Sequence, residues 1–462
     1  MEIEFLGAAG IVTGSCHMLT VNNKQYLLDC GMFQGIREIT KRNFVPFAFD
    51  PKKIQGVFLS HPHIDHSGLI PKLYKYGFRG AIYCTKATKD LCRIMLEDSA
   101  DIQERETIYD NKRLKREGLA LREPLYTKKD AILCMKLFKA VEYGHIVSVS
   151  PDVSLVFKDA GHILGSAIIE IFVKEKEVKK KLVFSGDLGK PNSPIVKDPT
   201  MISEADYVIM ESTYGSRIHE DVEERKTILL NIIKENYKKG GVLMIPSFAI
   251  ERTQELIYAL NEFVEHNKMP KMDVYVDSPL ATKATTVFMK HPECYDKEIK
   301  DLIAQGDLPF EFPGLRYVVS VQESKKLNDK KDPFIIIAGS GMCNGGRIKH
   351  HLKNHLKERK STVLFIGYQA KGTLGRRIRD GAKKIKIYGQ WYDIKVNIES
   401  IGGFSGHADQ PFLLEWAKNF KDKPQIYIVH GEPRESTALA EEIKKFNKNV
   451  HIAKLHQIVK IV

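Results

Sequence analysis

Residues 61–66, His-Pro-His-Ile-Asp-His, follow an apolar run and decide the fold of this chain. Three imidazoles and a carboxylate so close together at the end of a predicted strand need polar partners, and a divalent metal ion satisfies all of them at once. His61 and His63 are two apart, so in an extended loop they point the same way and can hold one ion. Asp65 and His66 follow where the chain turns and can reach a second ion. A polar loop that only capped a helix would need one Ser or Asp instead of three histidines.

Further candidate ligands each follow a run rich in Val, Ile, Leu or Phe, where a loop can present them. Each has an ordinary interpretation by itself, because an Asp at a strand end usually forms a turn and a lone His usually lies in a core or at the surface. Combined with the His-rich stretch, and with glycines beside most of them, they predict a cage for two metal ions. The candidates are Asp29, His162 in DAGHILGS, Asp187 in FSGDLG, Glu211 in MESTYG, His407 in GGFSGHADQ and His430 in VHGE.

These motifs resemble, in the same order, those of metallo-β-lactamase-fold nucleases that carry the β-CASP insertion. The loops at 338–347 and 367–377 also look like that family, and the likeness spans essentially the whole chain. It points to the compact prokaryotic ribonucleases related to the endonuclease subunit of the eukaryotic cleavage-and-polyadenylation machinery. The His-rich stretch alone would indicate only the superfamily, with its lactamases, thioesterases and glyoxalases. The motifs at Glu211, His407 and His430 narrow the resemblance to nucleic-acid hydrolysis.

The resemblance implies an α/β fold: a metallo-β-lactamase αββα sandwich with an inserted α/β β-CASP domain, and the active site in the cleft between them. The sequence pattern agrees, because the ligand motifs stop before a region of strand–helix alternation, typical of a parallel sheet, and resume after it. A chain of 462 residues is also long for one core. We predict the metallo-β-lactamase domain at 1–208 and 381–462 and the β-CASP domain at 209–380.

Hydrophobic periodicity predicts the elements inside these domains. Helices are expected around 86–107, 128–140, 250–266, 280–290 and 346–357. The lysine run 178–181 lies between two predicted strands and is expected to be a solvated hairpin turn, with an RNA contact as the alternative. The N-terminus has Glu2 and Glu4 where a secretory signal needs Lys or Arg, so it predicts an edge strand. His350 and His351 are expected at the surface of a helix.

In the predicted cage one group of ligands holds the first ion, a second group holds the other, and Asp187 bridges both. The groups are His61, His63 and His162, and Asp65, His66 and His430. Asp29 is expected to orient a ligating histidine, because metal-bound imidazoles usually donate their other N–H to such a carboxylate. Histidine-rich ligands favour zinc over magnesium, while manganese stays open.

The predicted reaction is hydrolysis of an RNA phosphodiester bond by a hydroxide that the two ions activate. Two dications against two ligating carboxylates, Asp65 and Asp187, leave an excess of positive charge. That excess lowers the pKa of a bridging water to about 7 and stabilises charge on the phosphate. His407 is the candidate general acid for the leaving oxygen, with Glu211 holding its tautomer. The family resemblance agrees, since it places both near the metals without making them ordinary ligands.

A glycine-rich loop at 339–347 joins a predicted strand to a helix. Its exposed backbone N–H groups and the helix N-terminus predict an anion site. The loop lacks the GK[ST] ending of a P-loop, which excludes a nucleoside triphosphatase. A phosphate of the bound strand is the expected guest, although exposed arginines on a helix are more often only solvated. The candidate contacts are Ser340, Gly341, Gly345, Gly346, Arg347 and Arg376.

Composition limits the partners and the compartment. The formal net charge of +13 and pI of about 9.1 suit a polyanion, although many basic proteins bind no nucleic acid. The seven cysteines are odd in number and never spaced CxxC, which argues against a disulfide framework and for a reducing cytoplasm. No apolar run approaches the ~20 residues that span a bilayer. We expect single-stranded RNA as partner and no membrane, with a homodimer or an RNA-processing or degradation complex left open.

Three competing functions remain beside the ribonuclease. The first is a DNA nuclease of the same superfamily, although in that branch the position of His430 typically resembles Val. The second is a catalytically inactive scaffold subunit, but such paralogues lack ligands and none is missing here. The third is a small-molecule hydrolase, against which the insertion and the pair Glu211 and His407 argue. The sequence leaves open whether cleavage is endonucleolytic, 5′-to-3′ exonucleolytic or both.

Overall fold

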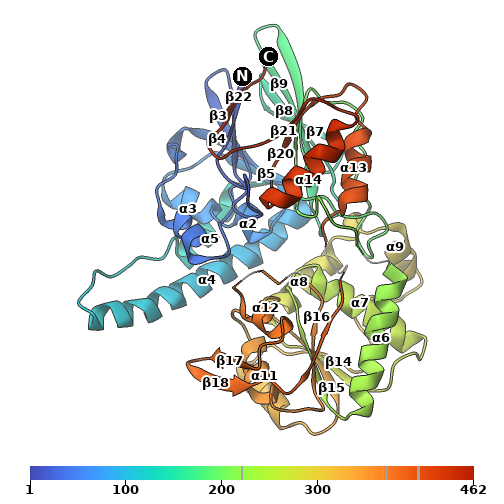
Figure 1. The fold of residues 1–462 in the computed structure, drawn as a ribbon. Coiled ribbons are helices and arrows are strands. Elements are labelled where there is room, and N and C mark those ends of the chain that lie inside the picture. The colour runs from blue at the N-terminus through green and yellow to red at the C-terminus, as the bar shows by residue number, and fades with distance from the viewer. Residues whose placement is uncertain (220–221, 368, 371, 403–405) are drawn as a thin grey trace. The chain divides into compact units, whose positions relative to one another are not determined.

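The computed structural model describes residues 1–219, 222–367, 369–370, 372–402 and 406–462. Within the quoted motifs and loops, Tyr368, Lys371, Gly403, Phe404 and Ser405 therefore lie outside the described residues. The chain forms two compact units, one of residues 1–218 and 407–462 and the other of residues 219–406 (Figure 1). The second unit interrupts the first in sequence, as the expected insertion requires.

The first unit contains two mixed sheets. One has the order β22-β1-β2-β3-β4-β5-β6, and the other β21-β20-β11-β10-β9-β8-β7. The strands of the first sheet are β1 (Glu2–Phe5), β2 (His17–Val21), β3 (Lys24–Leu28), β4 (Ile54–Phe58), β5 (Ala81–Thr85), β6 (Phe138–Val141) and β22 (Ile458–Lys460). Those of the second are β7 (Ile146–Ser150), β8 (Val153–Asp159), β9 (Ala167–Glu175), β10 (Val178–Phe184), β11 (Tyr207–Met210), β20 (Gln425–Ile428) and β21 (Val450–Ile452).

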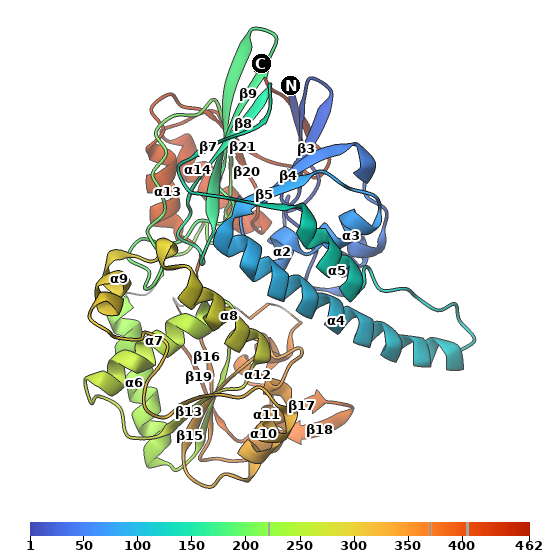
Figure 2. The same ribbon diagram turned by 180° about the vertical axis from the view of Figure 1, so that it is seen from behind.

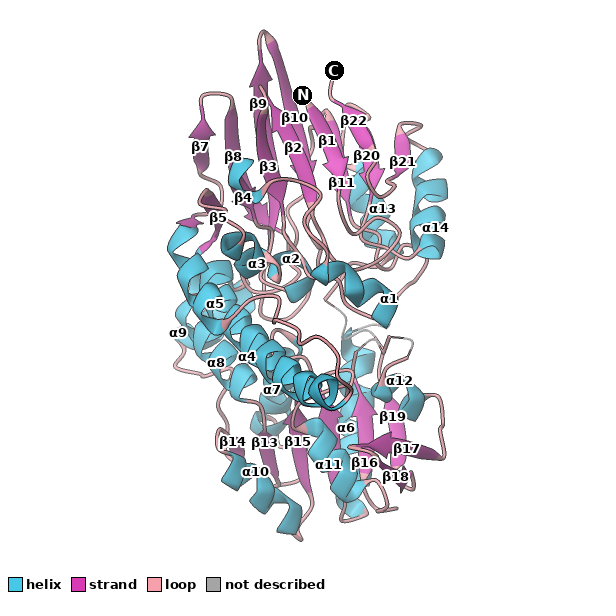
Figure 3. Ribbon diagram, turned by 90° about the vertical axis from the view of Figure 1, so that its left-hand side faces the viewer, coloured by secondary structure: helices cyan, strands magenta, loops and turns pink. Residues whose placement is uncertain are grey.

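The two sheets pack face to face, and helices cover the outer face of the first sheet and part of the outer face of the second (Figure 3). Alternate residues of both sheets, such as Leu19 and Ile169, form the central core, because successive side chains of a strand point to opposite faces. The helices over the first sheet are α2 (Ile64–Ser67), α3 (Ile70–Lys75), α4 (Lys86–Arg116) and α5 (Lys128–Cys134), of which α4 and α5 are prominent in Figure 2. The short helix α1 (Arg37–Thr40) buries no residue. Helices α13 (Gln410–Lys418) and α14 (Pro433–Lys444) cover part of the second. This is the expected αββα sandwich.

The second unit is built on a parallel sheet of order β14-β13-β15-β12-β16-β19. Its strands are β12 (Val242–Pro246), β13 (Asp273–Val276), β14 (Leu315–Tyr317), β15 (Phe334–Ala338), β16 (Thr362–Phe365) and β19 (Asn397–Ser400), beside a hairpin of β17 (Lys384–Ile387) and β18 (Gln390–Asp393). The helices are α6 (Val222–Lys238), α7 (Arg252–Glu265), α8 (Pro279–Lys290), α9 (Lys297–Ala304), α10 (Val321–Lys326), α11 (Ile348–His355) and α12 (Leu374–Arg379). The parallel sheet agrees with the predicted strand–helix alternation.

Strand direction brings the candidate ligands of the first unit together. Strands β10, β11 and β20 run parallel, so the loops after them meet at one edge of the sheet. Asp187, Glu211 and His430 lie in those loops. In the other sheet β3 and β4 are also parallel, which places Asp29 beside the loop that begins at His61.

Several sequence-based expectations about single elements were wrong. The lysines at 179–181 belong to β10 and the turn is at 176–177, because β9 and β10 pair in register up to Glu175 and Val178. The helix expected at 128–140 ends at Cys134 and gives way to β6. Strand β1 is not an edge strand, since β22 from the far end of the chain pairs with it.

The compact units also differ from the predicted domain limits. Strand β11 joins β10 and β20 of the first unit, so the first unit continues past residue 208. Strand β19 completes the parallel sheet, so the second unit continues past residue 380. The limits 1–208, 209–380 and 381–462, and a cleft between the domains, stay predictions.

Two further observations concern the chain as a whole. Among the described residues, no helix is both long and apolar enough to cross a membrane. No disulfide joins any of the seven cysteines within the described residues.

Candidate metal centre

The His-rich loop is held in place by the chain that precedes it. The backbone N–H groups of Ser15 and Cys30 donate to the carbonyl oxygens of Asp65 and His66, both at 2.8 Å. At Gly31 a β-carbon would lie 1.6 Å from the Asp65 carbonyl oxygen, so only glycine allows this approach. The loop that carries the first four candidate ligands is therefore packed against the residues after β3.

Four of the candidates converge on one point. His61, His63, His162 and Asp187 each offer a ligand atom, and these atoms all lie within 4.8 Å of one another. His63 Nδ1 is 3.1 Å from His61 Nε2 and 3.2 Å from His162 Nε2. Nitrogen ligands at ~2.0–2.1 Å from a tetrahedral zinc ion are separated by about 3.3 Å, so the spacing fits such an ion.

A second group adjoins the first. Asp65, His66 and His430 also offer ligand atoms within 4.8 Å of one another. His430 Nε2 lies 3.2 Å from His66 Nε2 and 3.6 Å from Asp65 Oδ2. The two groups are those that the sequence predicted for two ions.

Asp187 lies between the groups. Its Oδ2 is 3.4 Å from His61 Nε2, 3.6 Å from His162 Nε2 and 3.3 Å from His66 Nε2. Its buried Oδ1 lies 3.4 Å from His430 Nδ1 but makes no hydrogen bond within the part of the chain that the structure describes. A buried carboxylate oxygen without a hydrogen bond is costly unless a cation compensates it, so the donor set fits a metal ion.

The electrostatics of the histidines favour a cation. Burial lowers the pKa of His63 to about 4 and holds the pKa of His61 well below its ordinary range, so both are neutral, as a ligand must be. Burial opposes charge on His66 as well, but Asp187 and Asp29 raise its pKa well above the ordinary value. The carboxylates therefore attract positive charge, which a proton or a metal ion can supply.

Asp29 contacts His66 of the second group at the ring nitrogen that faces away from the other ligands. Its Oδ2 lies 2.6 Å from His66 Nδ1 and accepts a hydrogen bond from Ser60 Oγ, while its Oδ1 accepts from the Ser60 backbone N–H. His66 Nε2 is thereby left to face His430 and Asp187. This is the geometry expected of a carboxylate that orients a ligand.

Glu211 and His407 are paired at the margin of the cluster. His407 Nδ1 lies 3.3 Å from Glu211 Oε1 and 3.8 Å from Asp187 Oδ2. Glu211 is buried and also accepts from the backbone N–H groups of Leu188 and Thr213. Burial lowers the pKa of His407, but the carboxylates of Glu211 and Asp187 outweigh it and raise that pKa above its ordinary value. A protonated His407 can donate a proton to a reacting group.

Thr213 contributes a contact that sequence reasoning missed. Its Oγ1 lies 3.2 Å from His430 Nδ1, which leaves His430 Nε2 to face His66. Thr213 belongs to the quoted motif MESTYG, but only the parallel pairing of β11 and β20 brings that motif beside His430. No spacing along the chain could have indicated this contact.

The residues predicted to bind phosphate lie in the second unit, and many of their donors are occupied. Arg347 Nη1 donates to Asp277 Oδ1 at 2.6 Å, and its Nη2 donates to the Val319 carbonyl at 2.6 Å. The Ser340 backbone N–H donates to the Gly345 carbonyl, and the Gly345 N–H donates to Ser340 Oγ. Arg376 Nε donates to Asp380 Oδ2 at 2.6 Å.

Helix α11, which follows this loop, contributes a second partner for Asp277, the residue that pairs with Arg347. His351 was expected at the surface, but it is buried and its Nε2 lies 2.6 Å from Asp277 Oδ2. His350 is exposed, as expected. The backbone N–H groups of Gly341 and Gly346 could still face a ligand, because no hydrogen bond from them appears within the described residues. Phosphate contacts of Ser340, Gly341, Gly345, Gly346, Arg347 and Arg376 stay predictions.

Three family models match the chain. They are the metallo-β-lactamase superfamily over residues 9–124, the β-CASP domain over 253–378, and the RNA specificity domain of Zn-dependent metallo-hydrolases over 391–453. The matches cover both units and both sides of the insertion.

The chain is also similar in sequence to curated proteins and in fold to a solved structure. Ribonuclease TTHA0252 of Thermus thermophilus is 36% identical over 461 residues, which cover 100% of each chain. The transcription termination factor FttA of Methanocaldococcus jannaschii is 32% identical, over 98% of this chain and 70% of that protein. A crystal structure of an Enterococcus faecalis protein of unknown function covers 99% of both chains with a TM-score of 0.56 at 13% identity, a likeness of fold alone.

Proposed function

The chain belongs to the β-CASP ribonuclease family of the metallo-β-lactamase superfamily and is a hydrolase of the nuclease class, and we propose that it cleaves single-stranded RNA with two divalent ions. Family, fold class and enzyme class agree with the expectations from sequence. The single-stranded substrate and the number and identity of the ions belong to the proposal. Its support comes from the donor geometry and from the ribonuclease relative.

The position of Asp187 carries the proposal. One carboxylate oxygen lies 3.3–3.6 Å from histidines of both ligand groups, so it can join two adjacent ions. His61, His63 and His162 would hold one ion, and Asp65, His66 and His430 the other. Zinc suits this set best, because borderline metals prefer imidazole nitrogen and hard magnesium prefers oxygen. Manganese is the second candidate.

Side chains around the metal centre would have separate roles in the reaction. When bound, two divalent ions acidify water to near neutral pH and stabilise charge on the scissile phosphate. His407 donates a proton to the leaving ribose oxygen, and Glu211 accepts the hydrogen bond from Nδ1 that holds the ring in place. Asp29 keeps His66 in the orientation that faces the second group.

One set of cleavage assays tests the proposal. End-labelled unstructured RNA with a 5′-phosphate or a 5′-hydroxyl is incubated with zinc-loaded protein and its products are sized, beside single-stranded DNA of the same sequence and duplex DNA. We expect cleavage of the single-stranded RNA, abolished by a chelator and restored by zinc or manganese. The product sizes also separate endonucleolytic from 5′-exonucleolytic cleavage.

Three outcomes would contradict the proposal. Faster cleavage of single-stranded DNA would assign the protein to a DNA nuclease branch. Turnover of a nitrocefin-like lactam or ester without RNA cleavage would indicate a small-molecule hydrolase. Protein that holds metal but cleaves none of these substrates would support a scaffold subunit.

A further inference from the structure

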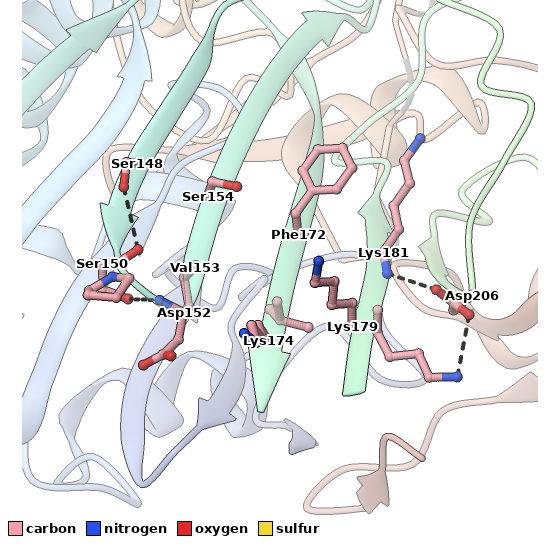
Figure 4. Close-up of a pocket in the computed structure, with 13 residues that line it drawn as sticks. Ser148, Ser150, Asp152, Val153, Ser154, Phe172, Lys174, Lys179, Lys181 and Asp206 are labelled. Atoms are coloured by element: carbon pink, nitrogen blue, oxygen red, sulfur yellow. Dashed lines mark hydrogen bonds and ion pairs between the residues drawn. The ribbon is translucent and has the colours of Figure 1, made fainter. Parts of the chain in front are cut away.

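The outer face of the second sheet has an uncovered region that the metal centre does not use. Helices α13 and α14 pack on the side of that sheet formed by β11 and β20. Over β7, β8, β9 and β10 the surface forms a hollow of about 450 Å³ instead (Figure 4). Its lining is polar and basic, and includes Ser148, Ser154, Phe172, Lys174, Lys179 and Lys181.

Two lysines in this hollow face each other. Lys174 of β9 and Lys179 of β10 are directly paired in the ladder, so both side chains point to the same face. Like charges in that position destabilise a sheet. No acidic partner of either ammonium group is found within the described residues. The sheet therefore holds two uncompensated positive charges side by side, which an anionic ligand would stabilise.

The acidic groups nearby are engaged elsewhere. Asp206 Oδ1 lies 3.5 Å from Lys180 Nζ, and Asp152 Oδ2 lies 3.6 Å from Lys24 Nζ. Glu170 is paired with Lys181 at 2.5 Å. Because these carboxylates are paired with other lysines, the positive charges of Lys174 and Lys179 are not neutralised by them.

An aromatic ring adjoins the lysines. Phe172 is 37% exposed on the same face, two residues before Lys174, and is paired with Lys181, whose ammonium group lies 5.6 Å from the ring centroid. Ser154 of β8 is the neighbour of Phe172 on the other side. An exposed ring between cations and hydroxyls is the arrangement by which sheet proteins stack bases and bind the flanking phosphates of single strands.

We propose that this surface, formed by Ser154, Phe172, Lys174, Lys179 and Lys181, is a second RNA-binding site for a part of the substrate remote from the cleaved bond. The proposal rests on the proposed ribonuclease function. RNA is favoured over an acidic protein because the ring and the lysines together match base and phosphate. We call it the distal RNA surface.

Its distance from the metal centre sets a length requirement. Ala167 of β9 follows the loop of His162, and Lys174 lies further along the same strand. A rise of roughly 3.3 Å per residue puts Lys174 about 23 Å from Ala167. A single strand stacked at roughly 3.4 Å per nucleotide needs about seven nucleotides to contact both sites, and a fully extended strand needs fewer. Shorter RNA can occupy the metal centre alone.

The test compares RNA lengths. Steady-state constants of the zinc-loaded protein are measured on unstructured RNA of about three nucleotides, too short to span about 23 Å even when extended, and of about thirty nucleotides. The ratio of kcat/KM for long over short RNA is the readout. We expect Lys174→Gln/Lys179→Gln to lower this ratio about tenfold and to reduce the salt slope of KM for the long RNA by about 1.4, since each phosphate contact contributes roughly 0.7.

Three further variants define the chemistry. Lys128→Gln/Lys129→Gln removes the same charge from α5, over the other sheet, and should keep the wild-type ratio. Phe172→Ala should lower the ratio about tenfold through lost stacking, and Phe172→Trp should restore it. Lys174→Arg/Lys179→Arg should retain the wild-type ratio because both charges remain.

The failures of the two proposals are distinguishable. If the wild-type protein cleaves no RNA, the ribonuclease proposal fails. If it cleaves RNA but the ratio is the same in the wild type, Phe172→Ala and Lys174→Gln/Lys179→Gln, the distal RNA surface is refuted and an acidic protein becomes the better occupant. An equal loss in Lys128→Gln/Lys129→Gln would also refute it, because net charge alone would then explain the effect.

Discussion

The metal centre of the first unit and a buried cluster of the second unit each contain an aspartate and histidine. The second cluster consists of Asp277, Ser324, Arg347 and His351. The two differ in whether the aspartate is fully hydrogen-bonded within the protein. Asp277 is buried and receives contacts of 2.6 Å from Arg347, His351 and Ser324. Asp187 is equally buried, but its neighbours are histidine nitrogens at 3.3–3.6 Å and one of its oxygens makes no hydrogen bond within the described residues. One cluster is complete within the protein, whereas the other has binding capacity left for a cation.

The comparison shows that residue type alone does not distinguish a binding site from a structural cluster. Buried polar groups are normally satisfied, so unsatisfied capacity is the informative observation. Burial would raise the pKa of Asp277, but His351, Ser324 and Arg347 hold it below its ordinary value. Arg347 therefore has a structural partner in addition to any role toward RNA.

The largest expected effect is on Asp187. Asp187→Ala should lose bound metal and slow RNA cleavage by more than about 10⁴-fold, because it removes the carboxylate that adjoins both ligand groups. Elemental analysis and single-turnover cleavage measure the two effects. Asp380→Ala, which removes an exposed carboxylate of the second unit, is the control and should keep its metal. An Asp187→Ala protein with full metal content would show that Asp187 is not the bridge.

The next effect separates a proton donor from a ligand. His407→Ala should slow cleavage by roughly 10²–10⁴-fold while most of the metal stays bound. A substrate with a sulfur leaving atom, which needs no proton, should recover much of the rate. Loss of a metal ion from this variant would instead make His407 a ligand. In that case a residue outside both ligand groups would complete the metal site.

The third prediction concerns the buried ion pair between Arg347 and Asp277 in the second unit. Arg347→Ala leaves the buried Asp277 carboxylate without its main cation and should lower the free energy of unfolding by about 3 kcal/mol. Arg376→Ala removes an exposed pair with Asp380 and should cost no more than about 1 kcal/mol. Urea denaturation measures both. An unchanged stability of Arg347→Ala, with weaker RNA binding, would favour the phosphate contact predicted from the sequence.

A smaller effect concerns a buried histidine, His17, for which the described part of the chain shows no ion pair with a carboxylate. His17 lies between the rings of Phe5 and Phe184, and burial lowers its pKa from 6.5 to about 3. The unfolded chain therefore binds a proton that the folded chain does not. The resulting stability is complete above pH 6.5 and is lost as the pH falls from 6.5 toward 3.

His17→Leu should remove this dependence. Between pH 7 and pH 5 the wild-type protein should lose about 2 kcal/mol more stability than the variant, at roughly 1.36 kcal/mol per pH unit below 6.5. Urea denaturation of both proteins at the two pH values measures the difference. Equal losses would mean that His17 does not contribute to acid sensitivity.

Much of the site could be predicted from local sequence. The His-rich loop and the other candidates follow apolar runs, and a strand followed by a polar residue is visible without any tertiary information. The sequence therefore predicts His61, His63, His162 and Asp187 as ligands of one cage, and in the folded chain their ligand atoms lie within 4.8 Å of one another. The inserted domain was visible as well, because the period of the hydrophobic pattern changes where the ligand motifs stop.

Only the tertiary structure decided which polar residues remain available to a ligand. The partner of Arg347 lies on β13, 70 residues earlier, and the burial of His351 depends on the same carboxylate. The facing of Lys174 and Lys179 depends on the register of β9 and β10, where a shift of one residue would turn the side chains of one strand to the opposite face. Residue types and spacings are local properties, and they determined the metal-binding chemistry. Long-range pairing decides which groups satisfy one another, so only the folded chain shows which ones are left to bind RNA.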